Sequence, residues 1–178
     1  MIADVNDILF HAEMSVRYHR RRATFLARSS SLMSTLLLVG GASAFASLYG
    51  NSTIVAKVTT LVLTAVGILQ MVFRIDEAAT KHHQWLKGWM SISRDIRSNP
   101  NAKSSQIKHW QDRICEIESE CFSELRALQV DCFNRTAIAL GRQSKPTPLK
   151  WRHRALIQIV SFEADFADLS EKEICGDP

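Results

Sequence analysis

The chain has 178 residues, about one domain's worth, and carries 22 Lys and Arg against 18 Asp and Glu. The basic excess lies beside an apolar block, with five basic against three acidic residues in 1–30 and six against three in 74–103. A nucleic-acid-binding domain would spread basic residues along one folded face, so this distribution argues against nucleic acid as a partner.

Residues 1–30 are predicted to form a basic amphipathic helix that runs along or up to a membrane. An Asp or Asn cap near the start precedes a stripe at three-to-four spacing, which consists of Val5, Ile8, Ala12, Ser15 and His19. The arginine triplet that follows, residues 20–22, is interpreted as the charge that flanks a transmembrane helix. Binding of this triplet to lipid phosphates or to an acidic partner stays open.

Residues 29–73 contain one charged side chain, Lys57. Segments of about 31–50 and 53–73 each have the length of a helix that crosses a hydrocarbon core of about 30 Å. The stretch "YGNS" between them is too short to return the chain across a bilayer, so we expect an antiparallel helical hairpin. Basic residues flank both outer ends, and the positive-inside rule then places both termini in the cytoplasm.

Two alternatives compete with this hairpin. It could be buried inside a soluble bundle, which would need other apolar helices to surround it. Alternatively, "ASAFAS" resembles a signal-peptidase site after a short apolar run, although its charged region would be thirty residues long and a second apolar segment follows at once.

Each apolar segment carries a distinctive stripe. Small residues in the first segment predict close helix packing, as in small-x-x-x-small pairs, and are Gly40, Gly41, Ser43, Ala44 and Ser47. A weakly polar face of the second consists of Thr53, Lys57, Thr60, Thr64, Gly67, Gln70 and Met71. Its threonines can bond to carbonyls of their own helix or to the first helix, or the face can line a water-filled path in an oligomer.

Residues 74–140 are predicted to form a cytoplasmic helical hairpin. Its first helix carries the stripe Trp85, Trp89, Ile92 and Ile96, and ends at Asn99-Pro100. From Gln106 to about Arg135 a near-heptad pattern predicts one helix, which either pairs with the first or self-associates as a coiled coil. Residues 141–149 form a linker, and 150–178 a C-terminal amphipathic helix and tail, although "ALIQIVSF" also alternates like a strand.

Features of an enzyme or a metal site do not occur in this sequence. It has no Gly-rich phosphate loop, no nucleophile elbow and no H-E-x-x-H motif. The adjacent His82 and His83 point to different faces, and the four cysteines contain no C-x-x-C pair, which is typical of small buried thiols in a reduced compartment. We therefore expect no catalytic residue, no metal and no cofactor.

Three stretches resemble the SLATT family, the SMODS and SLOG-associating two-transmembrane effectors of bacteria. They are "RYHRRRATFLARSSSL", "LLLVGGASAFASLYG" and "EAATKHHQWLKGWMSISRDI", and the resemblance covers about residues 10–98. The residues outside the apolar segments that fall where the family keeps similar types are Arg17, Tyr18, His19, Arg20, Arg21, Arg22, His82, His83 and Trp89.

The resemblance implies an all-α, oligomeric membrane protein of the bacterial inner membrane that acts in antiviral defence. Such an effector would stay inactive until a partner, a nucleotide second-messenger synthase or sensor protein, signals infection, and would then oligomerise and breach the bilayer. The competing hypothesis is a non-conducting membrane anchor or scaffold that recruits a cytoplasmic partner through residues 103–170. A soluble helical nucleic-acid binder is the third.

Overall fold

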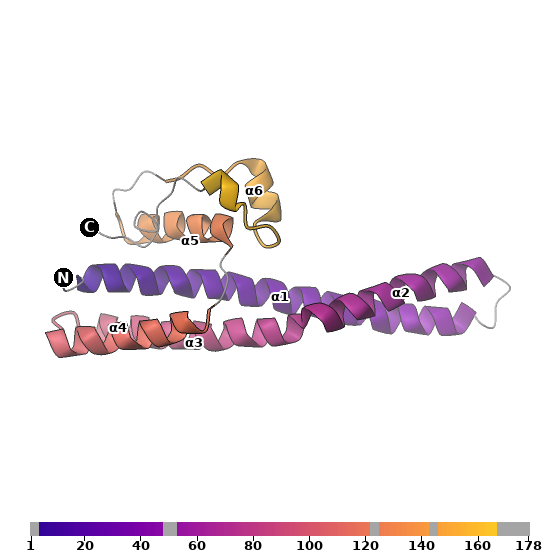
Figure 1. Cartoon of the computed structure of the whole chain (residues 1–178), viewed down its shortest axis with the longest axis horizontal. Coiled ribbons are helices and arrows are strands. Elements are labelled where there is room, and N and C mark those ends of the chain that lie inside the picture. Colours follow the sequence, from indigo (N-terminus) through magenta and orange to yellow (C-terminus); the bar gives the residue numbers. More distant parts are fainter. Residues whose placement is uncertain (1–3, 48–52, 122–124, 143–145, 167–178) are drawn as a thin grey trace. The chain divides into compact units, whose positions relative to one another are not determined.

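The computed structural model describes residues 4–47, 53–121, 125–142 and 146–166. All regular structure in these ranges is helical (Figure 1), so the all-α prediction is confirmed. The elements are α1 (Val5–Ser47), α2 (Thr53–Phe73), α3 (Ile75–Ser98), α4 (Ser104–Ser119), α5 (Arg126–Ala139), α6 (Trp151–Leu156) and the 3-10 helix η1 (Glu163–Phe166).

The chain divides into two compact units, and both α1 and α3 continue from one into the other. Residues 22–82 form the first, called here the hairpin unit, and residues 1–21 with 83–178 form the second, called the bundle unit. The predicted boundary between a helix of residues 1–30 and a transmembrane helix from residue 31 is absent, because α1 is a single helix of 43 residues.

The hairpin unit pairs the second part of α1 with α2 in antiparallel order. Gly40 lies against Leu63, Gly67 against Leu37, and Gln70 donates a hydrogen bond to Ser34 (Nε2 to Oγ, 3.2 Å). The residue numbers of successive contacts therefore decrease along α1 and increase along α2, as in an antiparallel pair. The turn expected at "YGNS" lies outside the described residues.

A break separates α2 from α3 at Arg74, whose φ of 43° is left-handed. The Arg74 carbonyl accepts the amide of Ala78 at 3.0 Å and so opens the new helix. Ser30 of α1 donates a hydrogen bond to the carboxylate of Asp76 in the first turn of α3. α2 and α3 are thus two distinct helices, where the sequence had suggested that helix continues past residue 73.

The first core of the bundle unit is built by α1, α3 and α4. Trp89, Ile92 and Ile96 of α3 are at most 2% exposed, and they pack with Ile8, Ala12 and Val16 of α1 and with Ile107, Trp110 and Ile114 of α4. Contacts such as the Arg113 to Asp95 ion pair (Nη1 to Oδ2, 2.9 Å) join α4 to α3. Since the α4 stripe is buried within its own chain, this conformation leaves it unavailable for a coiled coil with a second copy.

The second core lies on another face of α1 and corrects the prediction of a surface helix. Met14 and Tyr18 are buried with Ala127, Leu128 and Cys132 of α5, and the ring of Phe10 lies edge-on to that of Phe133 at 5.2 Å. The first part of α1 therefore contributes to two cores. A helix lying along a membrane would bury only one stripe in this way.

The prediction of one helix from Gln106 to about Arg135 is wrong. The first helix, α4, ends at Ser119, and α5 begins at Arg126 after Leu125, whose amide donates to the Tyr18 hydroxyl at 2.9 Å. Ending α4 early has a packing reason. The α4 stripe belongs to the first core, whereas the α5 stripe belongs to the second, on a different face of α1.

The C-terminal part contains less helix than expected. Gly141, with φ of 68°, ends α5, and the amide of Arg142 bonds the carbonyl of Ala137 at 2.9 Å in a Schellman motif. The side-chain amide of Asn134 then pairs in both directions with the backbone of Thr147, at 2.8 and 3.0 Å. Only six residues form α6, so the C-terminal amphipathic helix predicted from residue 150 is much shorter than expected.

Candidate functional site

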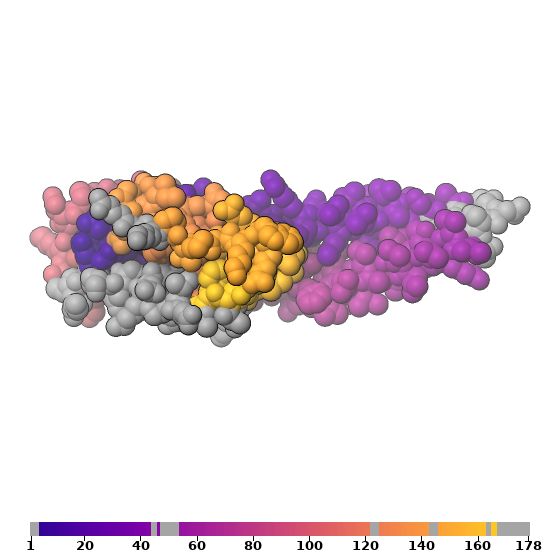
Figure 2. Space-filling model, turned by 90° about the horizontal axis from the view of Figure 1, so that it is seen from above, coloured from indigo at the N-terminus to yellow at the C-terminus, as the bar shows by residue number. Residues whose placement is uncertain are grey.

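The surface of the hairpin unit is strongly apolar. Both α1 and α2 are long and apolar enough to cross a membrane, and little of their apolar length is buried within the chain. Leu38 is 76% exposed, Ile54 78% and Met71 81%, and α2 shows side chains at the surface along its length (Figure 2, magenta). A hairpin buried in a soluble bundle would be covered by other helices, so that alternative is not supported.

Gly40 lies on the face of α1 that meets α2. A Cβ added at Gly40 would collide with the Leu63 side chain, whereas one added at Gly41 would meet nothing within 4 Å. Ser43 is exposed, and its hydroxyl donates to the carbonyl of Val39 at 2.9 Å. Of the predicted packing residues, Gly40 thus meets α2 and Gly41 and Ser43 do not, while the side chains of Ala44 and Ser47 lie outside the description.

The predicted polar face of α2 divides in two. Gly67 and Gln70 point toward α1, as the contacts above require, whereas Lys57, Thr60, Thr64 and Met71 are exposed. The hydroxyl of Thr60 donates to the carbonyl of Ala56, and that of Thr64 to the carbonyl of Thr60, both at 2.9 Å. Each hydroxyl proton is thus used within its own helix, and each hydroxyl oxygen keeps lone pairs that can accept further hydrogen bonds. The side chain of Thr53 is not described.

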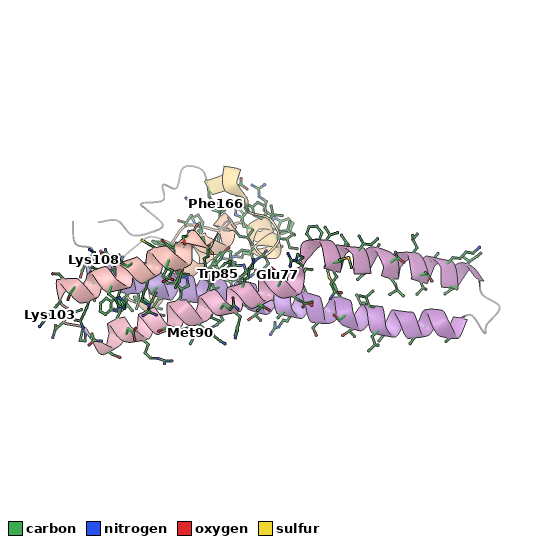
Figure 3. The ribbon with its side chains drawn as sticks, turned by 60° about the horizontal axis from the view of Figure 1, so that its bottom comes forward. Glu77, Trp85, Met90, Lys103, Lys108 and Phe166 are labelled. Atoms are coloured by element: carbon green, nitrogen blue, oxygen red, sulfur yellow. The ribbon has the colours of Figure 1, made fainter. Side chains whose placement is uncertain are left out.

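Charged and polar residues gather where α2 gives way to α3. Glu77 forms ion pairs with Arg74 and, at 3.5 Å, with Lys81, and Figure 3 marks its position near this junction. A cleft of about 430 Å³ opens beside them, between Gly67 and Glu77. The apolar surface of α2 therefore ends at a polar belt, as expected for the boundary of a membrane-facing segment.

Several of the residues on which the resemblance to the SLATT family rests are buried in the bundle unit. Tyr18 is 4% exposed and holds the start of α5 through its hydroxyl. His19, 2% exposed, lies between the rings of Tyr18 and Trp85, at 5.2 and 5.6 Å, and Trp89 is 2% exposed in the first core. These side chains fix the bundle rather than present a binding surface.

Asp131 joins α5 to α1 through arginine. Its carboxylate accepts hydrogen bonds from Arg21 and from Arg135, the latter at 2.8 Å. Burial alone would raise the pKa of Asp131, but the hydrogen bonds and charges of the two arginines outweigh it and hold that pKa below its usual range. Asp131 thus stays ionised near neutral pH, and its hydrogen bond from Arg21 ties the two helices together.

The two adjacent histidines have different surroundings. Partial burial and the charge of Arg22 lower the pKa of His82 to about 4, so its ring is neutral near pH 7. His83 is exposed. Among the residues that the structure describes, no group of three His, Cys, Asp or Glu side chains could hold a metal ion.

The cysteines differ in exposure, which predicts selective alkylation. Cys132 is fully buried, and that burial raises its pKa to about 11, whereas Cys115 is exposed on α4, unlike the buried thiol expected from the sequence. Because only the thiolate reacts, iodoacetamide at about pH 8 should modify Cys115 and spare Cys132 in the folded chain.

Peptide mass spectrometry would measure the fraction modified at each site, before and after denaturation in guanidinium chloride. Both cysteines should react after denaturation, which serves as the control for reagent and recovery. Equal modification of Cys115 and Cys132 in the folded chain would contradict the buried position of Cys132.

Comparison with protein-family models, with curated proteins and with solved structures finds no match for this chain.

Sequence reasoning missed two features. The second buried face of α1, formed by Phe10, Met14 and Tyr18, was signalled by their steps of four residues. A cleft lined by arginines between α1 and α3 gave no local signal, because its residues come from segments seventy residues apart.

Proposed function

We propose that this protein is a bacterial inner-membrane effector whose hairpins insert in the bilayer, associate on a signal and permeabilise it. The observation that carries the proposal is the exposed apolar surface of α1 and α2, interrupted by an exposed stripe of Lys57, Thr60 and Thr64. Lipid would cover the apolar side chains at a gain of about 25 cal/mol per Å². The antiviral context comes from the family resemblance.

The weakly polar stripe supports a conducting assembly over a lone hairpin. In a single hairpin, Thr60 and Thr64 face outward, and their hydroxyl protons already bond to helix carbonyls. Such back-bonded threonines tolerate lipid at little cost, yet their oxygens can accept hydrogen bonds from water. When several hairpins turn these stripes toward one another, the stripes would form the wall of a water-filled path.

The orientation that we propose places both termini in the cytoplasm. The arginines before the apolar part of α1 and the basic residues after α2 would remain on the cytoplasmic side, while Lys57 would extend to the opposite interface. The bundle unit would then be cytoplasmic and able to receive a signal from a partner or from other copies.

The test follows membrane potential with a fluorescent dye after induced expression in a bacterium. A Thr60→Leu, Thr64→Leu double variant should lose most of the depolarisation that the wild type causes, because leucine removes the oxygens that would hold water. A matched control is Thr35→Leu with Ser43→Leu, since both residues are exposed on α1 and their hydroxyls also bond back to carbonyls, at 2.8 and 2.9 Å.

Equal membrane abundance of the three proteins must be verified, and the control pair should still depolarise. Equal loss in both double variants would count against a conducting stripe on α2. A wild type that stays in the membrane without depolarising it would favour the anchor or scaffold.

The anchor or scaffold hypothesis cannot be tested with the segment 103–170 alone. Residues of α4 are buried against α1 and α3, and α5 packs on Met14 and Tyr18 of α1. The segment 103–170 therefore lacks most of its core when separated, and recruitment of a partner has to be tested with the full chain.

A further inference from the structure

A cleft of about 380 Å³ lies in the bundle unit between α1 and α3. Its α1 side is lined by Glu13 and Arg20, and its α3 side by Met90, Ser93, Arg94 and Arg97. Met90 precedes Ser93 and Arg94 by three and four positions, and Arg97 follows them by four and three, so these residues share one helix face. Figure 3 labels Met90 on this helix. The volume falls within the range of sites for small molecules.

The cleft is lined by three arginines and one carboxylate, that of Glu13. The Glu13 carboxylate is already bound by residues of the chain itself. The Oε1 atom of Glu13 accepts hydrogen bonds from the hydroxyl of Ser93 at 2.5 Å and from Nη2 of Arg97 at 2.9 Å. The Glu13 side chain is only 16% exposed. Its negative charge is therefore largely compensated at the wall of the cleft, and the surplus charge is positive.

Of the three arginines, Arg94 is the one whose hydrogen-bond donors are most available to a ligand. It is exposed, and within the part of the chain that the structure describes it forms no ion pair. A guanidinium group presents a planar fork of donors that matches two oxygens of a phosphate, and it forms charge-assisted hydrogen bonds about twice as strong as neutral ones. Met90 and the buried Val16 supply apolar walls beside it.

We propose that this cleft binds a phosphorylated anion, with Arg20, Arg94 and Arg97 as its phosphate ligands. The phosphate can come from a soluble polyphosphate or from the headgroup of an anionic lipid, since both present the same oxygens to arginine. Every residue involved belongs to the bundle unit, so this inference stands apart from the proposed membrane permeabilisation.

The first experiment titrates the full chain, held in phosphatidylcholine nanodiscs, with pyrophosphate in a calorimeter. Arg94→Gln should weaken binding by about tenfold or more, and Arg94→Lys by less, because lysine keeps the charge but loses the fork. Lys87→Gln is the matched control: Lys87 is exposed on the same helix but outside the cleft, and its loss removes the same charge. Unchanged helical circular dichroism would show that each variant folds.

The second arm repeats the comparison in nanodiscs that contain phosphatidylglycerol and counts retained lipids by native mass spectrometry. Fewer retained anionic lipids in Arg94→Gln than in Lys87→Gln would support the proposal and identify a lipid headgroup as the source. Pyrophosphate binding that depends on Arg94 would support it with a soluble source. Absence of both signals, or equal effects of the Arg94 and Lys87 variants, would overturn it.

Discussion

Replacing Trp89 by alanine should destabilise the bundle unit by about 3–5 kcal/mol. Trp89 is 2% exposed in the first core, where its ring meets that of His11 edge-on at 5.3 Å. Its indole nitrogen has no hydrogen-bond partner among the described residues, so the substitution leaves no partner unsatisfied and its cost is the lost packing. Chemical denaturation of the full chain in mild detergent, followed by circular dichroism, would measure the change.

Trp151→Ala is the control for that experiment. Trp151 begins α6 and is 82% exposed, so removing its ring should change the free energy of unfolding by no more than about 0.5 kcal/mol. Similar losses at Trp89 and Trp151 would contradict the core assigned to α1, α3 and α4. A large loss at Trp89 alone would indicate that Trp89 acts through the stability of the bundle unit.

Replacing Gly40 by leucine should push apart the two helices of the hairpin at the point where Gly40 meets Leu63. The new side chain would occupy the space of Leu63, and overpacking of this kind costs about 1–3 kcal/mol. Ser34 and Gln70, in contact at 3.2 Å, provide a measurement. In a chain whose native cysteines are alanine, Ser34→Cys and Gln70→Cys should be joined by a short bifunctional methanethiosulfonate crosslinker, and Gly40→Leu should lower the crosslink yield.

The neighbouring glycine makes a matched control for residue type and for position along the helix. Gly41 has open space around it, so Gly41→Leu should leave the crosslink yield near that of the parent chain. If Gly41→Leu lowered the yield as much as Gly40→Leu, the helix face assigned to the hairpin contact would be wrong.

The bounds of α2 and the end of α3 could be predicted from the sequence, because both depend on nearby residues. An uninterrupted apolar run predicted a second helix over 53–73, the range of α2, and Asn99-Pro100 predicted the end of α3 at Ser98. In each case the determining residues lie within one or two helical turns of the boundary. Of the small residues in the first apolar segment, the structure places only Gly40 against α2 among those whose side chains it describes.

Features that depend on distant partners could not be predicted in this way. Helical spacing places Gly67 on the same face of the helix as Thr60 and Thr64. It cannot tell that Gly67 lies against α1 while the two threonines are exposed. The near-heptad spacing continues past the end of α4, and for this reason it predicted one helix where the structure has two. The two halves of the pattern are buried in different cores. The arginine cleft requires α1 and α3 to lie side by side, which is a property of the folded chain.

The second core also constrains the order of events during synthesis. The Tyr18 hydroxyl accepts a hydrogen bond from the amide of Leu125, which lies 107 residues later in the chain. At about 5–20 residues per second, a ribosome needs roughly 5–20 s to make the intervening segment. Through that interval the face formed by Phe10, Met14 and Tyr18 has no α5 to cover it. The first helix to be made is thus among the last to complete its packing.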